Sequence, residues 1–476
     1  MAWETVIGLE VHVQLHTRTK MFCGNRTTFG DPPNSNVCPV CLGLPGALPV
    51  PNAEAIRLAV RGALALGCTV HEVSVFARKN YFYPDLPKGY QISQFDRPLA
   101  TGGSVGFESP ERGRMEVGIT RLHVEEDAGK LLHDRVPGKT AVDLNRAGIP
   151  LAEIVSEPDL RSPAEARAYL TTLRQILVYA GVSECSMEQG SLRVDANLSI
   201  RPAGASHLGT KTEVKNMNSF ANVERALEAE RARQVALVES GGRVEQVTLL
   251  FTAATGQVKP TRSKEESHDY RYFPDPDLPP LVLTPDWIAQ QRAAIPELPE
   301  AKRTRLESAY TLSGKDAQVI TAEAGLAHYF EAVVEAGADP KTAANWVMGD
   351  VMTSYNETGS FPVAARRLAA LIRLVRDGTV SHQAAKRIYG EMARLPEEEP
   401  REVAARLGLV QVSDQGALAG WVGEVLLAHP AEVARFRAGE TKLMAFFVGQ
   451  VMKRSKGGAD PKGVQPVLQE RLGQPV

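Results

Sequence analysis

Residues 7–15 read Ile7-Gly8-Leu9-Glu10-Val11-His12-Val13-Gln14-Leu15. Apolar and polar side chains alternate along this stretch, and neighbouring side chains of a β-strand point to opposite faces of a sheet. The alternation therefore predicts a strand with one apolar face, while its other face carries the Glu10 carboxylate and the His12 imidazole. Taken alone, this strand favours the ordinary interpretation of a solvated polar face over that of a site.

Two later stretches place acids at the ends or in the middle of apolar strands. Residues 118–127 end in Glu125, Glu126 and Asp127, whose mutual repulsion is costly unless water or a cation offsets it. Glu153 lies between hydrophobic neighbours, where an isolated charge would be expensive. A bound cation is the sharper of the two hypotheses for these acids.

Residues 192–201 alternate without a break and give one face with Arg193, Asp195 and Asn197, which either binds phosphate or RNA or faces water. The combined donors of these strands are carboxylates, amides and histidines without thiolates, a set that suits a hard cation such as Mg²⁺. Magnesium in turn suggests phosphate chemistry. The sequence has neither a P-loop nor a dinucleotide fingerprint, so an ATP site would be of an unusual kind.

Two segments, residues 78–90 and 270–274, concentrate aromatic and basic residues. The members with functional potential are Lys79, Tyr81, Tyr83, Lys88, Tyr90 and Arg271. Such rings can stack on a base while the basic groups neutralise phosphate. Equally, the rings can anchor a core from which the basic side chains reach solvent. The sequence leaves these two interpretations evenly balanced.

The chain has 476 residues, which suggests about three domains. Its net charge of −2 gives no whole-chain attraction to nucleic acid. Up to about residue 290, alternating runs mix with expected helices at 51–66, 162–180 and 222–240, and this mixture predicts an α+β domain. Apolar residues at helical spacing follow from about residue 300, which predicts an all-α part. Residues 397–400, Glu-Glu-Glu-Pro, suggest an exposed linker before a last helical unit.

The chain ends and the cysteines indicate the cellular setting. No secretory signal opens the sequence, and its densest apolar run, residues 443–452, is too short to cross a bilayer. We therefore expect a cytoplasmic protein with no membrane partner. Five cysteines, an odd number with three of them between residues 23 and 41, argue against a disulfide framework.

Several motifs together resemble the B-subunit family of the tRNA-dependent amidotransferases, the GatB family. They lie at residues 7–13, 79–85, 123–130, 142–146, 154–159, 269–274 and 449–453. The resemblance runs from end to end of the chain. It implies a catalytic cradle domain with a large mixed or antiparallel sheet at 1–293, a helical domain at 294–405 and a tRNA-binding tail domain at 406–476.

The resemblance also implies the reaction, the cofactors and the partners. ATP and Mg²⁺ serve to phosphorylate the side-chain carboxylate of Glu-tRNA(Gln) or Asp-tRNA(Asn), and ammonia then displaces the phosphate to give the amide. The ammonia comes from a glutaminase A subunit, whose Gly/Ser-rich amidase signature is missing here. A small C subunit, the misacylated tRNA and the misacylating aminoacyl-tRNA synthetase complete the expected partners. The sequence does not tell which of the two tRNAs is the substrate.

By position, the resemblance carries the family's functional residues onto this chain. The implied magnesium ligands are His12, Glu125 and Glu153. The implied catalytic support comes from Glu10, Glu126, Asp195 and Asn197. Implied contacts to substrate or ATP are Lys79, Tyr81, Tyr83, Lys88, Tyr90, Arg193 and Arg271.

The tail has its own charge balance. Residues 431–476 hold eight basic and four acidic residues, in a chain that is slightly acidic overall. Lys453, Arg454 and Lys456 follow the apolar run and precede two glycines, so a packed helix would present a basic end to a phosphate backbone. A solvated helix end is the alternative, and the resemblance favours tRNA binding by these three residues.

The clustered cysteines depart from the family pattern. Members of the family carry four thiolates for a structural zinc ion, whereas Asn25 stands here at the fourth position beside Cys23, Cys38 and Cys41. Either histidine or water completes a zinc site, or the three cysteines are reduced and buried. The second interpretation is favoured, so zinc is not among the expected cofactors.

Two functions from other classes compete with the amidotransferase. One is a noncatalytic tRNA-binding scaffold of the same complex, which ATPase activity dependent on misacylated tRNA would exclude. The other is a stand-alone Mg²⁺-dependent hydrolase, for which the sequence offers no nucleophile and base arrangement. Both rank far below the amidotransferase.

Overall fold

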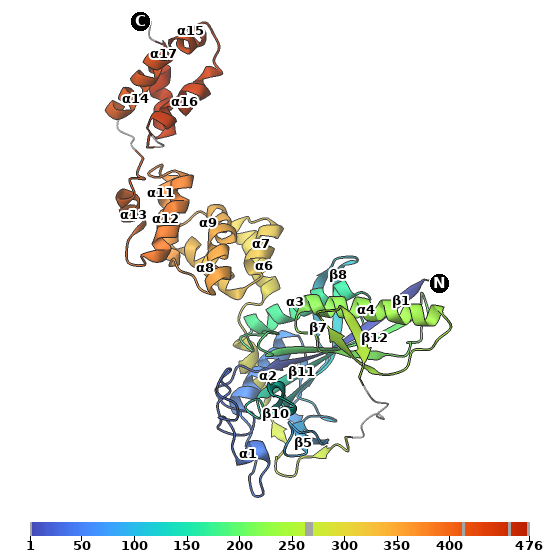
Figure 1. Cartoon of the computed structure of the whole chain (residues 1–476). Helices are drawn as coiled ribbons and strands as arrows, with labels where there is room; N and C mark the ends of the chain where they lie inside the picture. The colour runs from blue at the N-terminus through green and yellow to red at the C-terminus, as the bar shows by residue number, and fades with distance from the viewer. Residues whose placement is uncertain (1, 262–269, 412–414, 456–457, 474–476) are drawn as a thin grey trace. The chain divides into compact units, whose positions relative to one another are not determined.

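A computed structural model describes residues 2–261, 270–411, 415–455 and 458–473 (Figure 1). Their contacts divide the chain into two compact units, Met1–Pro299 and Glu300–Val476. The first unit is built on sheets and the second is helical, which confirms the predicted α+β class. The finer division of the second unit near residue 405 stays a prediction.

A ten-stranded sheet forms the centre of the first unit. Its main path runs β15-β14-β13-β12-β1-β11-β8-β6-β2, and β7 pairs with β8 beside it. The pairs are antiparallel except for β13 and β14. The bounds are β1 (Trp3–Gln14), β2 (Thr69–Val70), β6 (Ala100–Thr101), β7 (Ser104–Ser109), β8 (Gly113–Glu126), β11 (Pro150–Ser156), β12 (Leu192–Pro202), β13 (Thr212–Lys215), β14 (Thr248–Thr252) and β15 (Gln257–Pro260).

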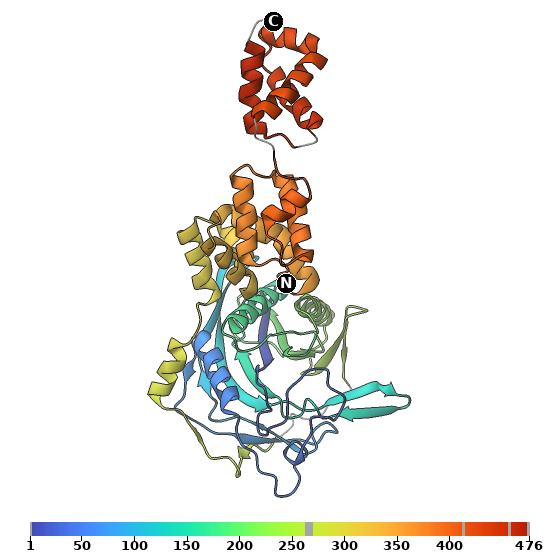
Figure 2. The same cartoon turned by 90° about the vertical axis from the view of Figure 1, so that its left-hand side faces the viewer.

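Three helices of the first unit begin at side-chain caps. The cap residues are Asn52 for α2 (Ala53–Ala65), Ser162 for α3 (Pro163–Tyr179) and Ser219 for α4 (Phe220–Glu239), each accepting a backbone N–H of the first turn. All three predicted helices are thus confirmed within two residues at each end. Helices α3 and α4 cover one side of the large sheet (Figure 2).

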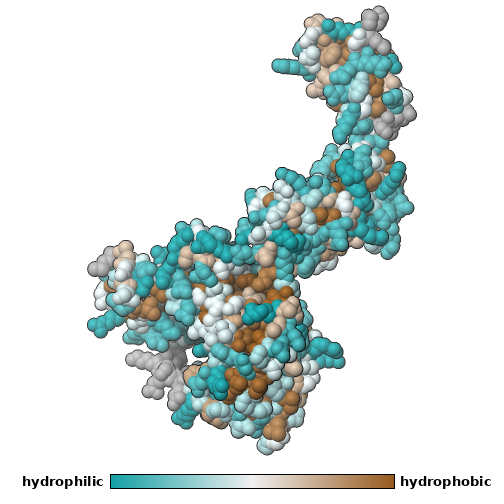
Figure 3. Space-filling view, turned by 180° about the vertical axis from the view of Figure 1, so that it is seen from behind, coloured by the Kyte–Doolittle hydropathy of each residue, from teal (hydrophilic) through white to brown (hydrophobic). Residues whose placement is uncertain are grey.

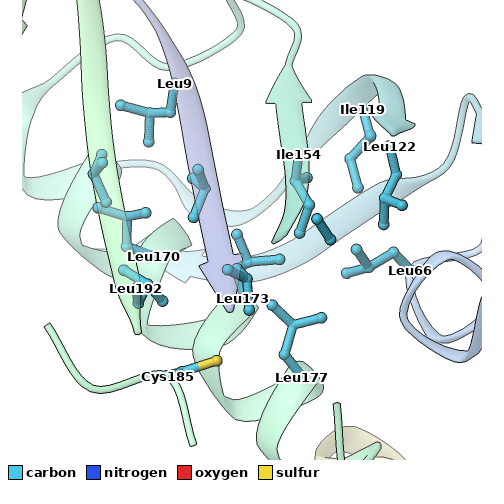
Figure 4. Close-up of a cluster of buried hydrophobic side chains, with 14 of the residues drawn as sticks. Leu9, Leu66, Ile119, Leu122, Ile154, Leu170, Leu173, Leu177, Cys185 and Leu192 are labelled. Atoms are coloured by element: carbon cyan, nitrogen blue, oxygen red, sulfur yellow. The ribbon is translucent and has the colours of Figure 1, made fainter. Parts of the chain in front are cut away.

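The apolar core lies between this side of the sheet and the helices. The buried residues Leu9 of β1, Ile154 of β11 and Leu192 of β12 belong to the same cluster as Leu170 and Leu173 of α3 (Figure 4). Burial of each such side chain contributes about 1.5–3 kcal/mol. Because the apolar face of β1 is committed to this core, its polar face must look to the opposite side of the sheet.

Smaller elements occupy that opposite side, where β5 and β10 are seen below the sheet (Figure 1). Sheet β16-β4-β5 joins distant parts of the sequence, because β16 follows β5 by some 180 residues. The bounds are β3 (Val73–Ser74), β4 (Ala77–Asn80), β5 (Tyr90–Ser93), β9 (Lys130–Val136), β10 (Lys139–Asp143), β16 (Phe273–Pro274), β17 (Leu281–Val282), α1 (Pro39–Leu42) and α5 (Pro285–Ala293).

The second unit contains helices and no strand among its described residues. They are α6 (Pro299–Tyr310), α7 (Gly314–Thr321), α8 (Ala324–Glu335), α9 (Pro340–Trp346), the π-helical turn η1 (Val347–Val351), α10 (Met352–Thr358), α11 (Ala365–Arg376), α12 (His382–Arg394), α13 (Pro400–Arg406), α14 (Gln415–Ala428), α15 (Pro430–Arg437), α16 (Leu443–Arg454) and α17 (Pro461–Gly473). Helices α14, α16 and α17 share a buried cluster that includes Leu418, Phe447 and Leu468. No helix within the described ranges is long and apolar enough to span a bilayer.

The predicted linker at residues 397–400 includes a short turn between α12 and α13, in which Glu397 and Glu399 are exposed, and it ends in the first turn of α13. Glu399 caps α13 in a capping box with Glu402, and Pro400 occupies the first turn. The buried Arg367 of α11 also donates to the backbone carbonyls of Leu395 and Glu398, the first at 2.9 Å. A run of acids before proline is therefore a helix start here, because the carboxylates satisfy backbone N–H groups that would otherwise be free.

Candidate functional site

Three predicted ligands meet on the polar face of the large sheet. His12 on β1 lies directly opposite Glu153 on β11, and Glu125 lies on the next strand, β8. The His12 Nε2 atom is 3.5 Å from a carboxylate oxygen of Glu125 and 3.5 Å from one of Glu153. One possible ligand atom from each of the three lies within 4.8 Å of the others. The structure thus brings together His12, Glu125 and Glu153, which we call the ligand triad.

A second histidine, His123, backs this triad. It lies opposite Glu153 across β8 and β11, and its Nε2 atom is 3.1 Å from Glu153 and 3.7 Å from Glu125. Arg121 Nε lies 3.4 Å from His123 Nδ1 on the side of the ring away from the acids. His123 is buried and faces both carboxylates, so it holds them in position.

The acids of the triad are buried, and imidazoles compensate their charge. Burial by itself raises the pKa of Glu153, but the charge of His123 and a hydrogen bond from His12 outweigh it and hold that pKa well below its ordinary value. For His123 burial acts in the other direction and lowers the pKa, but Glu153 and Glu125 outweigh it and raise that pKa to about 9. Among the described residues neither acid pairs with lysine or arginine, and Glu125 also accepts from Ser93 Oγ at 3.1 Å.

This donor set fits a divalent cation. Two buried carboxylates and one imidazole converge from three adjacent strands, so their positions are fixed by the sheet. Carboxylate oxygens are the ligands that Mg²⁺ prefers, usually with several water molecules retained. A cation at the triad would replace the positive charge that the histidines otherwise supply.

The other predicted support residues form a separate row on the neighbouring strands. Asn197 donates from Nδ2 to Glu10 at 3.1 Å, and Glu10 lies opposite Asp195 in the register of β1 and β12. Lys215 on β13 neutralises the row, since its Nζ atom is 2.8 Å from Asp195 and 3.0 Å from Glu213. Burial raises the pKa of Glu10, and repulsion from Glu153 adds to that rise. The row therefore continues the acidic face of the triad, and a cavity of about 290 Å³ adjoins it at Glu10 and Asn197.

Glu126, although next to Glu125 in sequence, has a different set of partners. It pairs with Lys88, and one of its carboxylate oxygens accepts the backbone N–H of Ile92 at 3.0 Å. Lys88 also lies over the ring of Tyr90, 5.2 Å from its centroid. These contacts fasten the strand β5 to the end of β8, so Glu126, Lys88 and Tyr90 form one group beside the triad.

Arg193 contacts Asp127, the last of the three consecutive acids in the stretch 118–127. Its guanidinium lies 2.6 Å from Asp127, which also receives a hydrogen bond from Gln14 Nε2 at 3.3 Å. Asp127 is buried, and Arg146 lies 3.7 Å from it. Arg193 therefore holds the loop after β8 against β1 and β12.

Lys79, one of the predicted aromatic and basic residues, interacts electrostatically with both acids of the triad. Burial lowers its pKa, but the charges of Glu125 and Glu153 raise it above its ordinary value. Its Nζ atom is 4.8 Å from the ring centroid of Tyr270, which packs edge-on against Tyr81. Lys79 thus places a positive charge between the acids and a group of tyrosine rings.

The aromatic segments contain both half-buried and exposed rings. Tyr81 is half-buried in the tyrosine group, whereas the rings of Tyr83 and Phe82 are largely exposed. Phe95 stacks on Tyr272 with centroids 4.1 Å apart. The side chain of Arg271 is exposed, and its backbone carbonyl accepts from Asn80. Sequence reasoning missed Phe95 as the partner of Tyr272 because their contact joins segments far apart in the chain.

The basic tail residues lie at the end of α16. Lys453 and Arg454 are exposed, and Arg454 pairs with Glu424 of α14 at 2.6 Å. Lys456 lies outside the described residues. Lys453 and Arg454 also line a pocket of about 760 Å³ with His429 and Gln450.

The sequence pattern alone indicates that His123 lies beside Glu125. His123 precedes Glu125 by two residues on a predicted strand, so the period of two places both side chains on one face. The prediction for this strand rested on its acids alone. A histidine two residues from an acid on a buried strand is a candidate partner of that acid.

Comparisons with known proteins cover nearly all of the chain. Residues 5–289 match the family model described as the GatB/GatE catalytic domain, and residues 328–472 match that of the GatB domain. A protein of Geobacter sulfurreducens, named as the B subunit of aspartyl/glutamyl-tRNA(Asn/Gln) amidotransferase, is 52% identical over 99% of this chain and 100% of its own length. Proteins of the same name in Moorella thermoacetica and Brevibacillus brevis are 52% and 50% identical over 99% of this chain, covering 100% and 99% of their own lengths.

Proposed function

The chain belongs to the GatB/GatE family, and from this we propose that it is the B subunit of a tRNA-dependent amidotransferase. In this role it activates the side-chain carboxylate of Asp-tRNA(Asn) or Glu-tRNA(Gln) at the expense of ATP and converts it to the amide. The enzyme is a carbon–nitrogen ligase that acts in translation. The observation that carries the proposal is the ligand triad on a sheet matched throughout by the family's catalytic domain.

The reaction needs activation because a carboxylate is a poor acyl donor. Its negative charge repels nucleophiles, and it has no good leaving group. Transfer of the γ-phosphoryl group of ATP to a carboxylate oxygen supplies one, and ammonia then displaces phosphate from the acyl carbon. Catalysis of such a transfer consists largely of positioning and of charge stabilisation around the phosphoryl oxygens.

We assign the triad His12, Glu125 and Glu153 as the residues that hold Mg²⁺. The ion would supply neutralising charge to the phosphoryl oxygens during transfer. The chain's own residues prepare the place: His123 orients the two carboxylates, and the sheet register fixes His12 opposite Glu153. The row of Glu10, Asp195 and Asn197 extends the polar face on which the substrate is held.

Lys79 and the surrounding rings are assigned to substrate and ATP. The Lys79 ammonium lies beside the acids, where it can approach a phosphate or the carboxylate of the aminoacyl group. The rings of Tyr81 and Tyr83, with Arg271, offer faces on which a base can stack. Arg193, Lys88 and Tyr90 already have protein partners, so their assigned part is to fix the floor of the site.

Ammonia is assigned to a partner, the glutaminase A subunit, with the small C subunit completing the complex. An exposed apolar surface on the first unit supports such an assembly, and one face of that unit shows apolar residues gathered together (Figure 3). Phe29, Leu44, Leu48 and Val50 are between 47% and 71% exposed. Large exposed apolar residues close in sequence are typical of surfaces that bind another protein.

The tail is assigned to the body of the tRNA. Its basic residues Lys453 and Arg454 are exposed at the end of α16, and residues 431–476 carry twice as many basic as acidic residues. Phosphate contacts of this kind position a nucleic acid without reading its sequence.

The proposal is tested with the assembled complex and misacylated tRNA. Ammonium chloride replaces glutamine, so that the glutaminase step does not limit the reaction. We expect Glu125→Gln and Glu153→Gln to lower ATP-dependent amide formation at least a hundredfold. The matched control is Glu116→Gln, which makes the same change at an exposed position of β8.

Two results would overturn this assignment. Amide formation by Glu125→Gln at the rate of Glu116→Gln would remove the triad from the chemistry. If complexes assembled with the unmodified chain bind misacylated tRNA but show no tRNA-dependent ATP hydrolysis, the scaffold function is favoured instead.

A further inference from the structure

Three cysteines gather outside the ligand triad, in the segment after β1. The Cys41 sulfur, in α1, lies 3.7 Å from the Cys23 sulfur and 3.8 Å from the Cys38 sulfur. Cys41 is buried, whereas Cys23 and Cys38 are half-buried. The remaining cysteines, Cys68 and Cys185, are buried elsewhere in the apolar core.

The side chain of Lys20 reaches into this cluster and is fully buried. Its ammonium donates to the carbonyl of Asn36 at 2.7 Å, to the carbonyl of Leu144 at 3.3 Å and to the Cys41 sulfur at 3.4 Å. A buried ammonium is costly unless an anion compensates it. Within the described part of the chain no carboxylate forms an ion pair with Lys20. Among the groups that contact the Lys20 ammonium, the Cys41 sulfur is therefore the one that can carry a compensating negative charge.

The other neighbours of the Cys41 sulfur are also donors. Asn25 Nδ2 lies 3.4 Å from it, and the thiols of Cys23 and Cys38 can each direct a proton to it. Four donors therefore surround one sulfur, as expected around an anion. A structural zinc ion requires four ligands, and here the fourth position holds an amide that directs N–H to the sulfur, with an ammonium beside it. These residues do not fit zinc.

We propose that Cys41 is a metal-free thiolate held by the Lys20 ammonium, and that it reacts with a hydroperoxide to form a disulfide with Cys38. The two cysteines are three residues apart and their sulfurs are close, so a small shift brings them to bonding distance. The site is separate from the proposed amidotransferase chemistry and does not depend on it.

The chemistry balances in two steps. The Cys41 thiolate attacks one peroxide oxygen, so an S–O bond forms, the O–O bond breaks, and hydroxide leaves from hydrogen peroxide. The Cys38 thiol then attacks the sulfur of the resulting sulfenic acid, so the S–S bond forms, the S–O bond breaks, and water leaves with the Cys38 proton. Two cysteines lose two electrons, and one peroxide gains them.

The electrostatic surroundings separate Cys41 from the core cysteines. The hydrogen bond from Cys23 and the charge of Lys20 lower the pKa of Cys41 to about 4, against the opposing effect of burial. Burial raises the pKa of Cys68 to about 12 and that of Cys185 to about 11. Because the thiolate is the reactive form, the chain carries two internal controls that should resist oxidation.

Oxidation would also loosen a local anchor. The Lys20 ammonium ties Asn36 and Leu144 together, and a Cys41 disulfide removes the thiolate that serves as its counter-ion. The segment that ends β10 would then lose a fixed contact with the cysteine segment. The inferred site is therefore a redox-sensitive link between residues 20–41 and 144.

The test uses the full-length reduced chain and hydrogen peroxide. At successive times the chain is unfolded in denaturant with N-ethylmaleimide, which blocks every free thiol, and peptides are analysed by mass spectrometry. We expect a Cys38–Cys41 disulfide to appear while Cys68 and Cys185 remain fully alkylatable. Lys20→Met should slow the reaction at least tenfold at neutral pH.

Variants that keep the lysine make the test independent of the folding of Lys20→Met. In Cys41→Ser, peroxide should produce no disulfide between Cys23 and Cys38, and formation of one at the unmodified rate would overturn the assignment of Cys41 as nucleophile. In Cys38→Ser, Cys41 should stop at sulfenic acid or pair with Cys23. Metal analysis should find no stoichiometric zinc in the purified chain, and one zinc per chain would overturn the proposal.

Discussion

Removal of the His123 side chain tests how the triad is held together. His123 is buried and contacts both acids, at 3.1 Å to Glu153 and 3.7 Å to Glu125. In His123→Ala, His12 is the one imidazole of the described residues left in contact with the two buried carboxylates. Loss of one partner of a buried charge pair typically costs about 3–5 kcal/mol, and we expect a loss of that order in the free energy of unfolding of the first unit without metal.

A double substitution isolates the cause of this loss. In His123→Ala with Glu153→Gln, the uncompensated charge is gone, so the combined loss should be at least ~1 kcal/mol smaller than the sum of the single losses. Added Mg²⁺ should also reduce the loss in His123→Ala, because a cation at the triad supplies the missing positive charge. His133→Ala, at an exposed histidine of β9, is the control, with an expected change within about 0.5 kcal/mol.

The assay must follow the first unit alone, because the two units need not unfold together. Urea titrations of the full chain, with pulsed hydrogen exchange of peptides from β1, β8 and β11, give the midpoint for that unit. The reasoning is refuted if His123→Ala loses less than about 1 kcal/mol in the absence of metal and if Mg²⁺ protects it no more than it protects His133→Ala.

Three further predictions concern the fold and the tail. Glu165→Gln should destabilise the first unit by about 2–4 kcal/mol in urea, because the buried carboxylate accepts from Arg112, Ser109 and the backbone of Arg161. Burial raises the pKa of Glu165, but these bonds outweigh burial and lower the pKa below its ordinary value of 4.5. The charged carboxylate therefore stabilises the fold fully above pH 4.5, and this stabilisation is lost as the pH falls through the lowered pKa. The acid-unfolding curve of Glu165→Gln should lack this loss. Leu173→Ala should cost about 2–5 kcal/mol by the same assay, since Leu173 is fully buried between α3 and the sheet, and a loss below ~1 kcal/mol would contradict that packing. Deletion of residues 415–476 should weaken tRNA binding by the complex and flatten its salt dependence, and an unchanged salt slope would separate the tail from tRNA.

Local patterns predicted much of the first unit. The alternation in residues 7–15 is realised in β1, whose apolar residues are buried while Glu10, His12 and Gln14 are half-buried. The helices expected at 51–66, 162–180 and 222–240 are realised as α2, α3 and α4, each beginning at a side-chain cap, which acts within one turn. The ligand triad itself came from the family resemblance, and the register of β1 and β11 explains why it assembles.

The parts that the sequence did not reveal depend on contacts between distant segments. The pairing of β16 with β4 and the stack of Phe95 on Tyr272 join residues about 180 to 200 positions apart, and no local period encodes them. The contact of Lys20 with Cys41 depends on how a loop folds back. His123 is a different case, because its place beside Glu125 follows from the strand period.

The central claim, that this site activates a carboxylate as an acyl phosphate, is tested most directly by oxygen transfer. Misacylated tRNA carrying ¹⁸O in its side-chain carboxylate is converted by the complex with ATP and ammonium, and the released phosphate is analysed by mass spectrometry. The account predicts one ¹⁸O atom in each phosphate for the unmodified chain and for Glu116→Gln, and no labelled phosphate above background for Glu125→Gln. Amide formed with unlabelled phosphate, or label transfer by Glu125→Gln at the unmodified rate, would contradict it.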